Sequence, residues 1–389
     1  MSRQFPLAQR VAEIRPFHVM ELLARARALE AAGRDIVHME IGEPDFPTPQ
    51  PVIDAALKAV ATGNMFYTPA LGMPEVREAI ARYYRERYGV TVPAERIVVT
   101  SGSSGALMLA CILLVNPGDR VLMADPGYPC NRNFVRAMGG EPLEVPVGPD
   151  TDFQLTAPLA AAHWRERTVG VLVASPSNPT GTLVPAAELA AMAALARERG
   201  AALVVDEIYH GLTYEGECPT ALACSEEVFV INSFSKYFGM TGWRLGWMVA
   251  PQRYVRELDK LSQNIYLSAP TPSQHAALAA FTPRNLAILE ARRLEFKRRR
   301  DYLVPALRAL GFDIHRDPQG AFYVYAGCSR LTADSFEFSR RLLEEAGVAI
   351  TPGLDFGHNH PESYVRFAYT VAVERLEEGV RRIGAFLGR

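Results

Sequence analysis

Long apolar runs, cysteines and an excess of charge of either sign are all scarce in this chain of 389 residues. No stretch approaches the ~20 consecutive apolar residues of a membrane-spanning helix. Residues 1–15 are mixed and charged, without the apolar centre of a signal peptide. The formal net charge of -2 leaves no basic surface for nucleic acid and no polybasic membrane patch. These absences favour a small charged metabolite as the partner, with no nucleic acid and no membrane involved.

The five cysteines are scattered and odd in number. Such usage is typical of reduced thiols rather than of a disulfide framework or a zinc site, so we expect a cytoplasmic protein. His358 and His360 near Asp355 offer metal-ligating side chains, but the Gly-His-Asn-His-Pro composition is typical of a turn and no further ligands complete a site. The sequence therefore predicts no metal centre.

Short β-branched runs alternate with alanine-rich helical stretches between about residues 97 and 231, and after residue 273 the pattern changes to mixed helices and strands. The alternation predicts repeated βα units and a mostly parallel sheet. We expect an α/β protein: a large domain with a mostly parallel sheet flanked by helices, and a smaller α+β domain built from the N- and C-terminal segments. The expected buried strands are 97–100, 120–123, 169–174, 202–205, 228–231 and 246–249.

The smaller domain is expected to contain the two ends of the chain. Near the start, a helix is predicted at about 19–32 and a strand at 36–41; near the end, helices at 292–310, 335–346 and through 387, and strands at 320–325 and 363–369. The expected division is 1–45 for the N-terminal segment of the small domain, 46–285 for the large ligand-binding domain and 286–389 for the C-terminal part of the small domain.

Ligands gather at the carboxyl ends of the strands in an open parallel sheet. The residues that directly follow each hydrophobic run are therefore the candidates for ligand binding. After 97–100, small residues lead into a helix, whose N-terminal amides attract an anion, and we assign Ser103 and Ser104 to a phosphate. The same turn also suits an ordinary helix cap. After 120–123, a Pro-Gly turn either holds Tyr128 against a flat ligand or packs it in the core.

Lys236 lies in Ser-Phe-Ser-Lys directly behind the run 228–231, where a long surface side chain is not expected. A desolvated lysine loses its proton more easily, and the neutral amine condenses with an aldehyde to form a Schiff base. The hydroxyls of Ser233 and Ser235 and the guanidinium of Arg244 suit a phosphate, so the aldehyde that we expect is pyridoxal phosphate. The alternative is a lysine on a solvated loop.

Three further side chains fit such a ligand. Asn178, between two prolines, can donate to a phenolate oxygen, and Tyr209 can donate beside it. Asp206 leaves a Leu-Val-Val strand and is costly to bury unless it meets a cation such as a protonated pyridine nitrogen; otherwise it is a helix N-cap. Arg366, in a strand-like segment, is either a rim charge or a bidentate clamp for a carboxylate.

These motifs, in this order, resemble the class I and II pyridoxal-phosphate aminotransferases of the aspartate aminotransferase fold (fold type I), over nearly the whole chain. The matching segments are Ile-Gly-Glu-Pro-Asp-Phe at 41–46, Tyr-Thr-Pro-Ala-Leu-Gly at 67–72, Ser-Asn-Pro-Thr-Gly at 177–181, Asp-Glu-Ile-Tyr at 206–209, Ser-Phe-Ser-Lys at 233–236 and Gly-Trp-Arg-Leu-Gly at 242–246.

The resemblance implies a ping-pong exchange in which an amino acid gives its amino group to the cofactor, held as an internal aldimine on Lys236, and the pyridoxamine form passes it to a 2-oxo acid. Lys236 then also serves as the general acid and base, with Asp206 and Tyr209 as the other catalytic residues.

The resemblance also implies positions around the substrate and the partner subunit. Gly42 and Asn178 are expected at the substrate carboxylate beside Arg366. Tyr67 is expected to reach the phosphate of the neighbouring subunit, which implies a homodimer with shared active sites. Aspartate-using relatives are similar in carrying a basic residue near the phosphate turn, where this chain has Ser104, so a dicarboxylic substrate is disfavoured.

The substrate pocket and two alternative functions remain open at this level. Phe17, His18 and Val19 are expected to line the pocket and would suit apolar, aromatic or small side chains. A carbon-sulfur β-lyase on the same fold would use the same lysine and aspartate, because only the bond broken at the α carbon differs. A non-catalytic cofactor-binding sensor would need a DNA-binding module, for which we expect no segment in this chain.

Overall fold

A seven-stranded sheet dominates the computed structural model, which describes residues 7–14, 16–216 and 218–389. The strand order is β2-β8-β7-β6-β5-β3-β4, and only β8 runs antiparallel to its neighbours. The α/β class with a mostly parallel sheet is thereby confirmed. The strands are β2 (Ile97–Thr100), β3 (Arg120–Asp125), β4 (Glu141–Pro146), β5 (Thr168–Ala174), β6 (Ala202–Asp206), β7 (Val228–Ser233) and β8 (Gly246–Val249).

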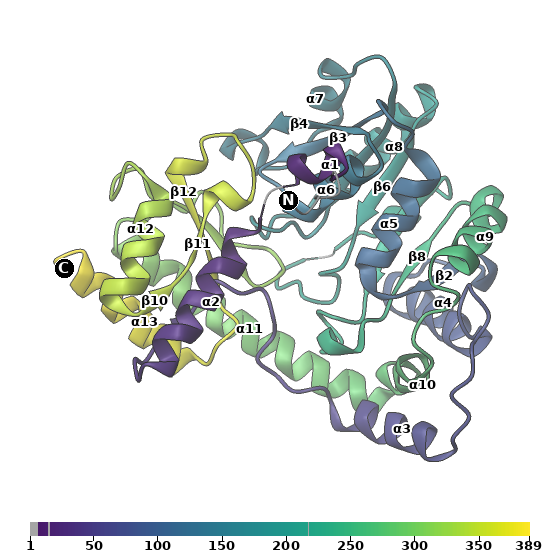
Figure 1. The fold of residues 1–389 in the computed structure, drawn as a ribbon, viewed down its shortest axis with the longest axis horizontal. Helices are drawn as coiled ribbons and strands as arrows, with labels where there is room; N and C mark the ends of the chain where they lie inside the picture. Colours follow the sequence, from purple (N-terminus) through teal and green to yellow (C-terminus); the bar gives the residue numbers. More distant parts are fainter. Residues whose placement is uncertain (1–6, 15, 217) are drawn as a thin grey trace, which may run out of the picture.

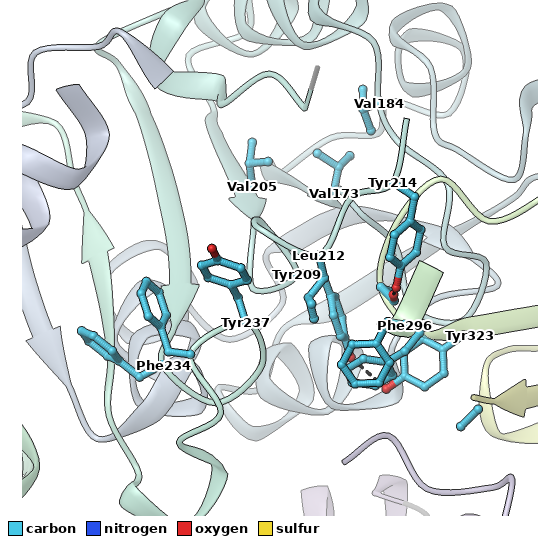
Figure 2. Close-up of a cluster of buried hydrophobic side chains, with 14 of the residues drawn as sticks. Val173, Val184, Val205, Tyr209, Leu212, Tyr214, Phe234, Tyr237, Phe296 and Tyr323 are labelled. Atoms are coloured by element: carbon cyan, nitrogen blue, oxygen red, sulfur yellow. Dashed lines mark hydrogen bonds between the residues drawn. The ribbon is translucent and has the colours of Figure 1, made fainter. Parts of the chain in front are cut away.

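Helices cover both faces of this sheet (Figure 1). In β6, Leu203 and Val205 pack in the hydrophobic cluster that includes α8 (Ala186–Glu198), whereas Val204 packs in the cluster that includes α5 (Gly102–Leu114). Successive side chains of a strand point to opposite faces, and a strand buried on both faces is hydrophobic throughout. Figure 2 shows part of the first cluster, from Val173 and Val205 toward aromatic rings of the C-terminal part.

The other helices of this part follow the expected alternation. They are α3 (Gln50–Ala61), α4 (Pro74–Tyr88), α6 (Pro129–Ala137), α7 (Ala157–Ala162), α9 (Val255–Ile265) and α10 (Thr271–Ala280), and the short α1 (Gln9–Glu13) lies near α6. Among the described residues, no helix is both long and apolar enough to cross a membrane.

The remaining strands form two small sheets. β9 (Tyr323–Gly327), β12 (Tyr364–Ala368) and β11 (Thr351–Pro352) make an antiparallel sheet, and β1 (Val37–His38) pairs in parallel with β10 (Val348–Ala349). The segment with α2 (His18–Ala31) and β1 therefore packs against the C-terminal part (Figure 1). α2 contacts β10 and β11, α12 (Ser335–Arg341) contacts β11, and α13 (Val373–Phe386) contacts β1 and β10.

One long helix, α11 (Pro283–Ala309), connects the two parts of the molecule. It starts near α3 and α10 and ends against α13, and Figure 1 shows it running between the two groups of elements. The helix continues across the boundary expected at residue 285. The division into domains at 45 and 285 stays a prediction.

Several expected boundaries are wrong for local reasons. The strand expected at 36–41 is only two residues long. The Met39 N–H donates to Ala349 O, whereas Met39 O accepts from the Ala368 N–H. The backbone hydrogen bonds of Met39 are thus divided between two sheets, and the pairing with β10 ends there. The helix expected from 292 starts at Pro283, where proline suits the first turn and the Thr282 hydroxyl caps the end.

The other differences concern polar and irregular segments. β4 was not expected, because Glu141 and Glu144 make it read as a polar loop, whereas it is an edge strand that pairs only with β3. The helix expected at 335–346 ends in a π-helical turn (Leu342–Ala346). The strand expected at 320–325 begins at Tyr323, since Ala321 has a left-handed backbone with φ of 58°.

Candidate active site

A cavity of about 360 Å³ lies where the strands of the main sheet end. Because the carboxyl ends of parallel strands meet at one edge, residues far apart in the sequence are brought together there. The predicted residues that line it are Gly42, Ser103, Ser104, Tyr128, Asn178, Asp206, Tyr209, Ser235, Lys236, Arg244 and Arg366.

Lys236 points into this cavity from the turn after β7. Its Nζ donates a hydrogen bond to Gly42 O at 2.7 Å. The pKa of Lys236 is lowered to about 8: burial is the largest cause, the carboxylate of Glu43 opposes it, and the guanidinium groups of Arg366 and Arg244 add to the lowering. A neutral amine, which is the nucleophilic form, is therefore accessible close to neutral pH. The solvated-loop alternative is wrong for this residue.

Asp206 ends β6 and is buried. Its Oδ1 accepts a hydrogen bond from the Ile208 N–H at 3.1 Å, and burial raises the pKa of the carboxyl to about 7. No helix of the described chain starts at this residue, since residues 208–211 form a turn and the next helical segment begins at Ala221. The N-cap alternative is therefore wrong, and the buried carboxyl favours a cationic partner.

The N-terminus of a helix forms another part of the cavity lining. Ser103 and Ser104 occupy the first turn of α5, whose unpaired amides favour an anion. Two glycines allow this geometry: a Cβ at Gly246 would lie 2.6 Å from Ser103 N, and one at Gly102, with φ of 75°, would lie 2.6 Å from Arg244 Nη2. The helix terminus, the serine hydroxyls and the guanidinium thus converge, an arrangement suited to a phosphate.

Two residues that the sequence assigned to a phosphate do not line the cavity. Ser233 is buried, and its hydroxyl accepts from the Ser235 N–H at 3.0 Å and donates to Leu245 O at 3.4 Å, so it shapes the turn that carries Lys236. Tyr67, on the segment between α3 and α4, is 81% exposed.

Arg366 in β12 is only 3% exposed, which excludes a rim charge. Its Nη1 donates to Asn178 Oδ1 at 2.9 Å, and its Nη2 donates to Glu40 O at 2.5 Å. The guanidinium also stacks over the rings of Tyr323 and Phe356, at 4.2 and 4.8 Å from their centroids. A rigid, buried guanidinium facing a cavity is suited to a carboxylate.

Tyr323 in β9 is a site residue that the sequence did not reveal. Its hydroxyl lies 2.9 Å from that of Tyr209, a hydrogen bond drawn in Figure 2. A Cβ at Gly42 would lie 1.8 Å from the same hydroxyl, so any larger residue there would force the ring or the backbone to shift. An aromatic residue in a strand-like segment is typical of a core position, and the sequence offers no other signal for this role.

The N-terminal segment supplies apolar lining. Phe17 and Val19 face the cavity, together with Ile41 and Leu107. His18 faces a neighbouring cavity instead, and its backbone N–H donates to Asp355 Oδ1 at 2.9 Å.

The described residues contain no group of three His, Cys, Asp or Glu side chains placed to hold a metal ion. Asp355, near His358 and His360 in the sequence, accepts the backbone N–H groups of His18 and Val19, at 2.9 and 2.8 Å. This carboxylate therefore anchors the N-terminal segment.

Known proteins resemble this chain over its full length. The family described as "Aminotransferase class I and II" matches residues 34–383. The chain is 43% identical over 378 residues to the valine--pyruvate aminotransferase of Mycobacterium tuberculosis, covering 97% of each protein. It is 37% identical over 387 residues to the aspartate/prephenate aminotransferase of Thermus thermophilus, covering 98% of this chain and 99% of that protein. The crystal structure of an aminotransferase from Mycobacterium tuberculosis aligns with a TM-score of 0.95 at 42% identity, over 99% of this chain and 100% of the other.

Proposed function

The chain belongs to the class I and II aminotransferase family, whose members use pyridoxal phosphate, and from this premise we propose that it transfers the amino group of an apolar amino acid to a 2-oxo acid in the cavity around Lys236. The observation that carries this proposal is the convergence of a half-buried amine of lowered pKa, a buried carboxyl and a buried guanidinium on one cavity.

The donor groups of this cavity fit the cofactor. The phosphate would be held by the α5 terminus with Ser103 and Ser104, and by Ser235 and Arg244. When bound, pyridoxal phosphate supplies an aldehyde that accepts an amine and a ring that withdraws electrons from the substrate's α carbon.

The remaining lining residues have partners on the ring. Asp206 would hold the ring nitrogen protonated, because a buried carboxyl is stabilised by a cation. Tyr209 and Asn178 would donate to the phenolate oxygen, since the Asn178 amide N–H₂ is left available when its Oδ1 accepts from Arg366. Tyr128 would pack against the ring.

Lys236 and Arg366 act on the substrate. The neutral Nζ of Lys236 takes the α proton of the amino acid and returns a proton later, as a general base and then a general acid. Arg366 binds the α-carboxylate, and Gly42 leaves room beside it. Truncating Arg366 would leave a carboxylate unpaired in a buried site, at a cost of about 3–5 kcal/mol.

The lining supports an apolar donor such as valine. Phe17, Val19 and Leu107 offer apolar contacts, and Ser104 stands near the phosphate turn, where the family resemblance associates a basic residue with aspartate-using members. The cations that line this cavity, Lys236, Arg244 and Arg366, each already have a role. One relative is named for valine and pyruvate, another for aspartate and prephenate; the lining favours the first.

We further propose a homodimer with shared active sites. Apolar side chains of α3 and the segment after it, Leu57, Val60, Phe66 and Tyr67, are exposed in the single chain, and covering them with a second copy would remove apolar surface from water. Tyr67 would then reach the phosphate of the neighbouring subunit. A cytoplasmic location is supported by the five free cysteines.

The test is the visible absorption of the purified protein with pyridoxal phosphate, titrated with single amino acids and then with 2-oxo acids. We expect valine to bleach the band of the bound cofactor and pyruvate to restore it. Lys236→Ala, with an unchanged circular dichroism spectrum, should show no turnover. Faster reaction with aspartate would refute the donor class, and release of pyruvate from thioether amino acids without an acceptor would identify a β-lyase.

A further inference from the structure

A second cavity of about 390 Å³ adjoins the active-site cavity. His18, Cys130, Arg132 and Arg136 contribute to its lining, and among the residues that the structure describes Phe17 alone lines both cavities. Among the described residues, Phe17 therefore marks the boundary between the two cavities.

Two short segments form the wall around this ring. Val19 and Tyr128 face the active-site cavity, whereas their sequence neighbours His18 and Pro129 face the second one. The Phe17 ring closes the wall by an edge-to-face contact with Tyr128, at 6.4 Å between centroids. The backbone after Phe17 is held in place, because the N–H groups of His18 and Val19 both donate to the Asp355 carboxylate.

From this geometry we propose that Phe17 is a specificity-determining residue that limits the size of the substrate side chain by separating the two cavities. This inference rests on the proposed transamination of apolar amino acids. With the ring in place, branched aliphatic side chains of valine size fit; with the ring removed, aromatic side chains extend into the second cavity.

The second cavity contributes space rather than a free charge. Arg132 donates to Glu144 at 3.1 Å and to the carbonyl oxygens of Asp355 and Phe356 at 2.8 and 3.1 Å, and Arg136 lies 3.5 Å from the same Glu144. Since these guanidinium groups already have partners, neither of them is a free counter-ion for a dicarboxylic substrate. The increase in kcat/KM on removing the Phe17 ring is therefore expected only for bulky aromatic substrates.

The experiment compares kcat/KM for valine and phenylalanine, with pyruvate as acceptor, in the holoenzyme and in Phe17→Ala. We expect the phenylalanine-to-valine ratio to rise at least about tenfold, the size of effect that a few methylene equivalents of pocket volume produce. A second readout, independent of turnover, is the calorimetric Kd of two unreactive analogues, 3-phenyllactate and 2-hydroxyisovalerate, whose ratio should shift in the same direction.

Two further variants serve as controls. His18→Ala removes a ring that faces only the second cavity and should leave the substrate ratio within about twofold of the wild type. Phe17→Leu keeps part of the wall, should give an intermediate ratio, and replaces the alanine variant if that one does not fold.

An unchanged ratio in Phe17→Ala or Phe17→Leu protein that retains the wild-type cofactor spectrum and unfolding midpoint would overturn the inference, as would a wild type that already prefers phenylalanine. Both results leave transamination itself standing. A wild type inert toward all apolar amino acids would instead remove the proposed donor class, and the analogue Kd ratios would then decide the role of Phe17 separately.

Discussion

At the scale of single residues, burial shifts the pKa values of a basic and an acidic side chain toward neutral pH. Desolvation disfavours the charged form of any group, so it lowers the pKa of Lys236 to about 8 and raises that of Asp206 to about 7. Both groups line the same cavity, so each can exchange a proton near physiological pH without a large energetic cost.

The lowered pKa of Lys236 predicts how the cofactor-free protein reacts with pyridoxal phosphate. The fraction of neutral amine rises about tenfold per pH unit below the pKa and levels off above it, so the rate at which the visible band appears should level off above pH about 8. Stopped-flow absorbance measures this, with Nα-acetyl-lysine as the control for the cofactor's own titration. A rate that still climbs tenfold per unit up to pH 10 would contradict the burial argument.

Gly42→Ala should impair substrate binding while the protein stays folded. A Cβ there would lie 1.8 Å from the Tyr323 hydroxyl, so the ring or the backbone must move, and the contact from Lys236 Nζ to Gly42 O moves with it. We expect kcat/KM to fall at least about tenfold. Gly242→Ala is the matched control, because Gly242 also lines the cavity but has open space around its Cβ position. Equal activity of both variants would argue against a tight fit at Gly42.

At the scale of elements, β1 is anchored by a charged bridge. His38 Nδ1 lies 2.7 Å from Glu40 Oε1, and its Nε2 lies 3.1 Å from Glu30 Oε1 on α2. The hydrogen bond with Glu40 raises the pKa of His38 to about 9, against the opposing effect of burial. Two residues beyond the strand, Glu40 O accepts from Arg366, so the same bridge steadies the backbone that holds this guanidinium, the proposed carboxylate clamp.

This bridge predicts a loss of stability in alkali. Because the folded-state pKa of His38 is above its ordinary value of 6.5, the stabilisation is complete below pH 6.5 and is lost as the pH rises through about 9. Urea unfolding at pH 6 should show His38→Gln less stable than the wild type by on the order of 2 kcal/mol.

The difference between wild type and His38→Gln should shrink by pH 9.5. Glu30→Gln, which removes the more exposed of the two carboxylates, should have a smaller effect at either pH. A difference that does not change with pH would mean that His38 acts through packing alone.

At the scale of the whole molecule, α11 connects the two parts by contacts at both ends. Near its start Glu290 accepts from the hydroxyl of Tyr237, the neighbour of Lys236, at 2.7 Å. Further along, Arg299 donates to both oxygens of Asp45 at 2.8 and 3.0 Å. The helix thus links the turn that carries the lysine to the segment that carries Gly42.

The proposed dimer is tested by light scattering after size exclusion. We expect a particle of twice the 42.8 kDa chain mass. Leu57→Glu combined with Val60→Glu should dissociate it, because a charge in a covered apolar patch is unfavourable.

Tyr67→Phe should leave the dimer intact and raise the Kd for pyridoxal phosphate about tenfold, the loss of one hydrogen bond to a charged group. A monomeric wild type with full activity would rule out shared active sites.

Much of the site was predictable because its signals are local. Buried β-branched runs mark the strands, and polar residues directly after them mark the edge where Asn178, Asp206 and Lys236 meet. The edge strand β4 was missed because Glu141 and Glu144 interrupt its hydrophobic pattern. β8 was predicted without its direction, since strand orientation depends on the pairing partners and not on composition.

The sequence by itself determined the α/β class, the strand ends and the chemistry at them, because hydrophobic periodicity and turn residues are properties of neighbouring positions. Only the tertiary structure decided that Tyr323 pairs with Tyr209, that Ser233 supports the turn without lining the cavity, and that Phe17 lines two cavities. These relations depend on how distant parts of the chain pack around one cavity, and that packing exists only once the chain has folded.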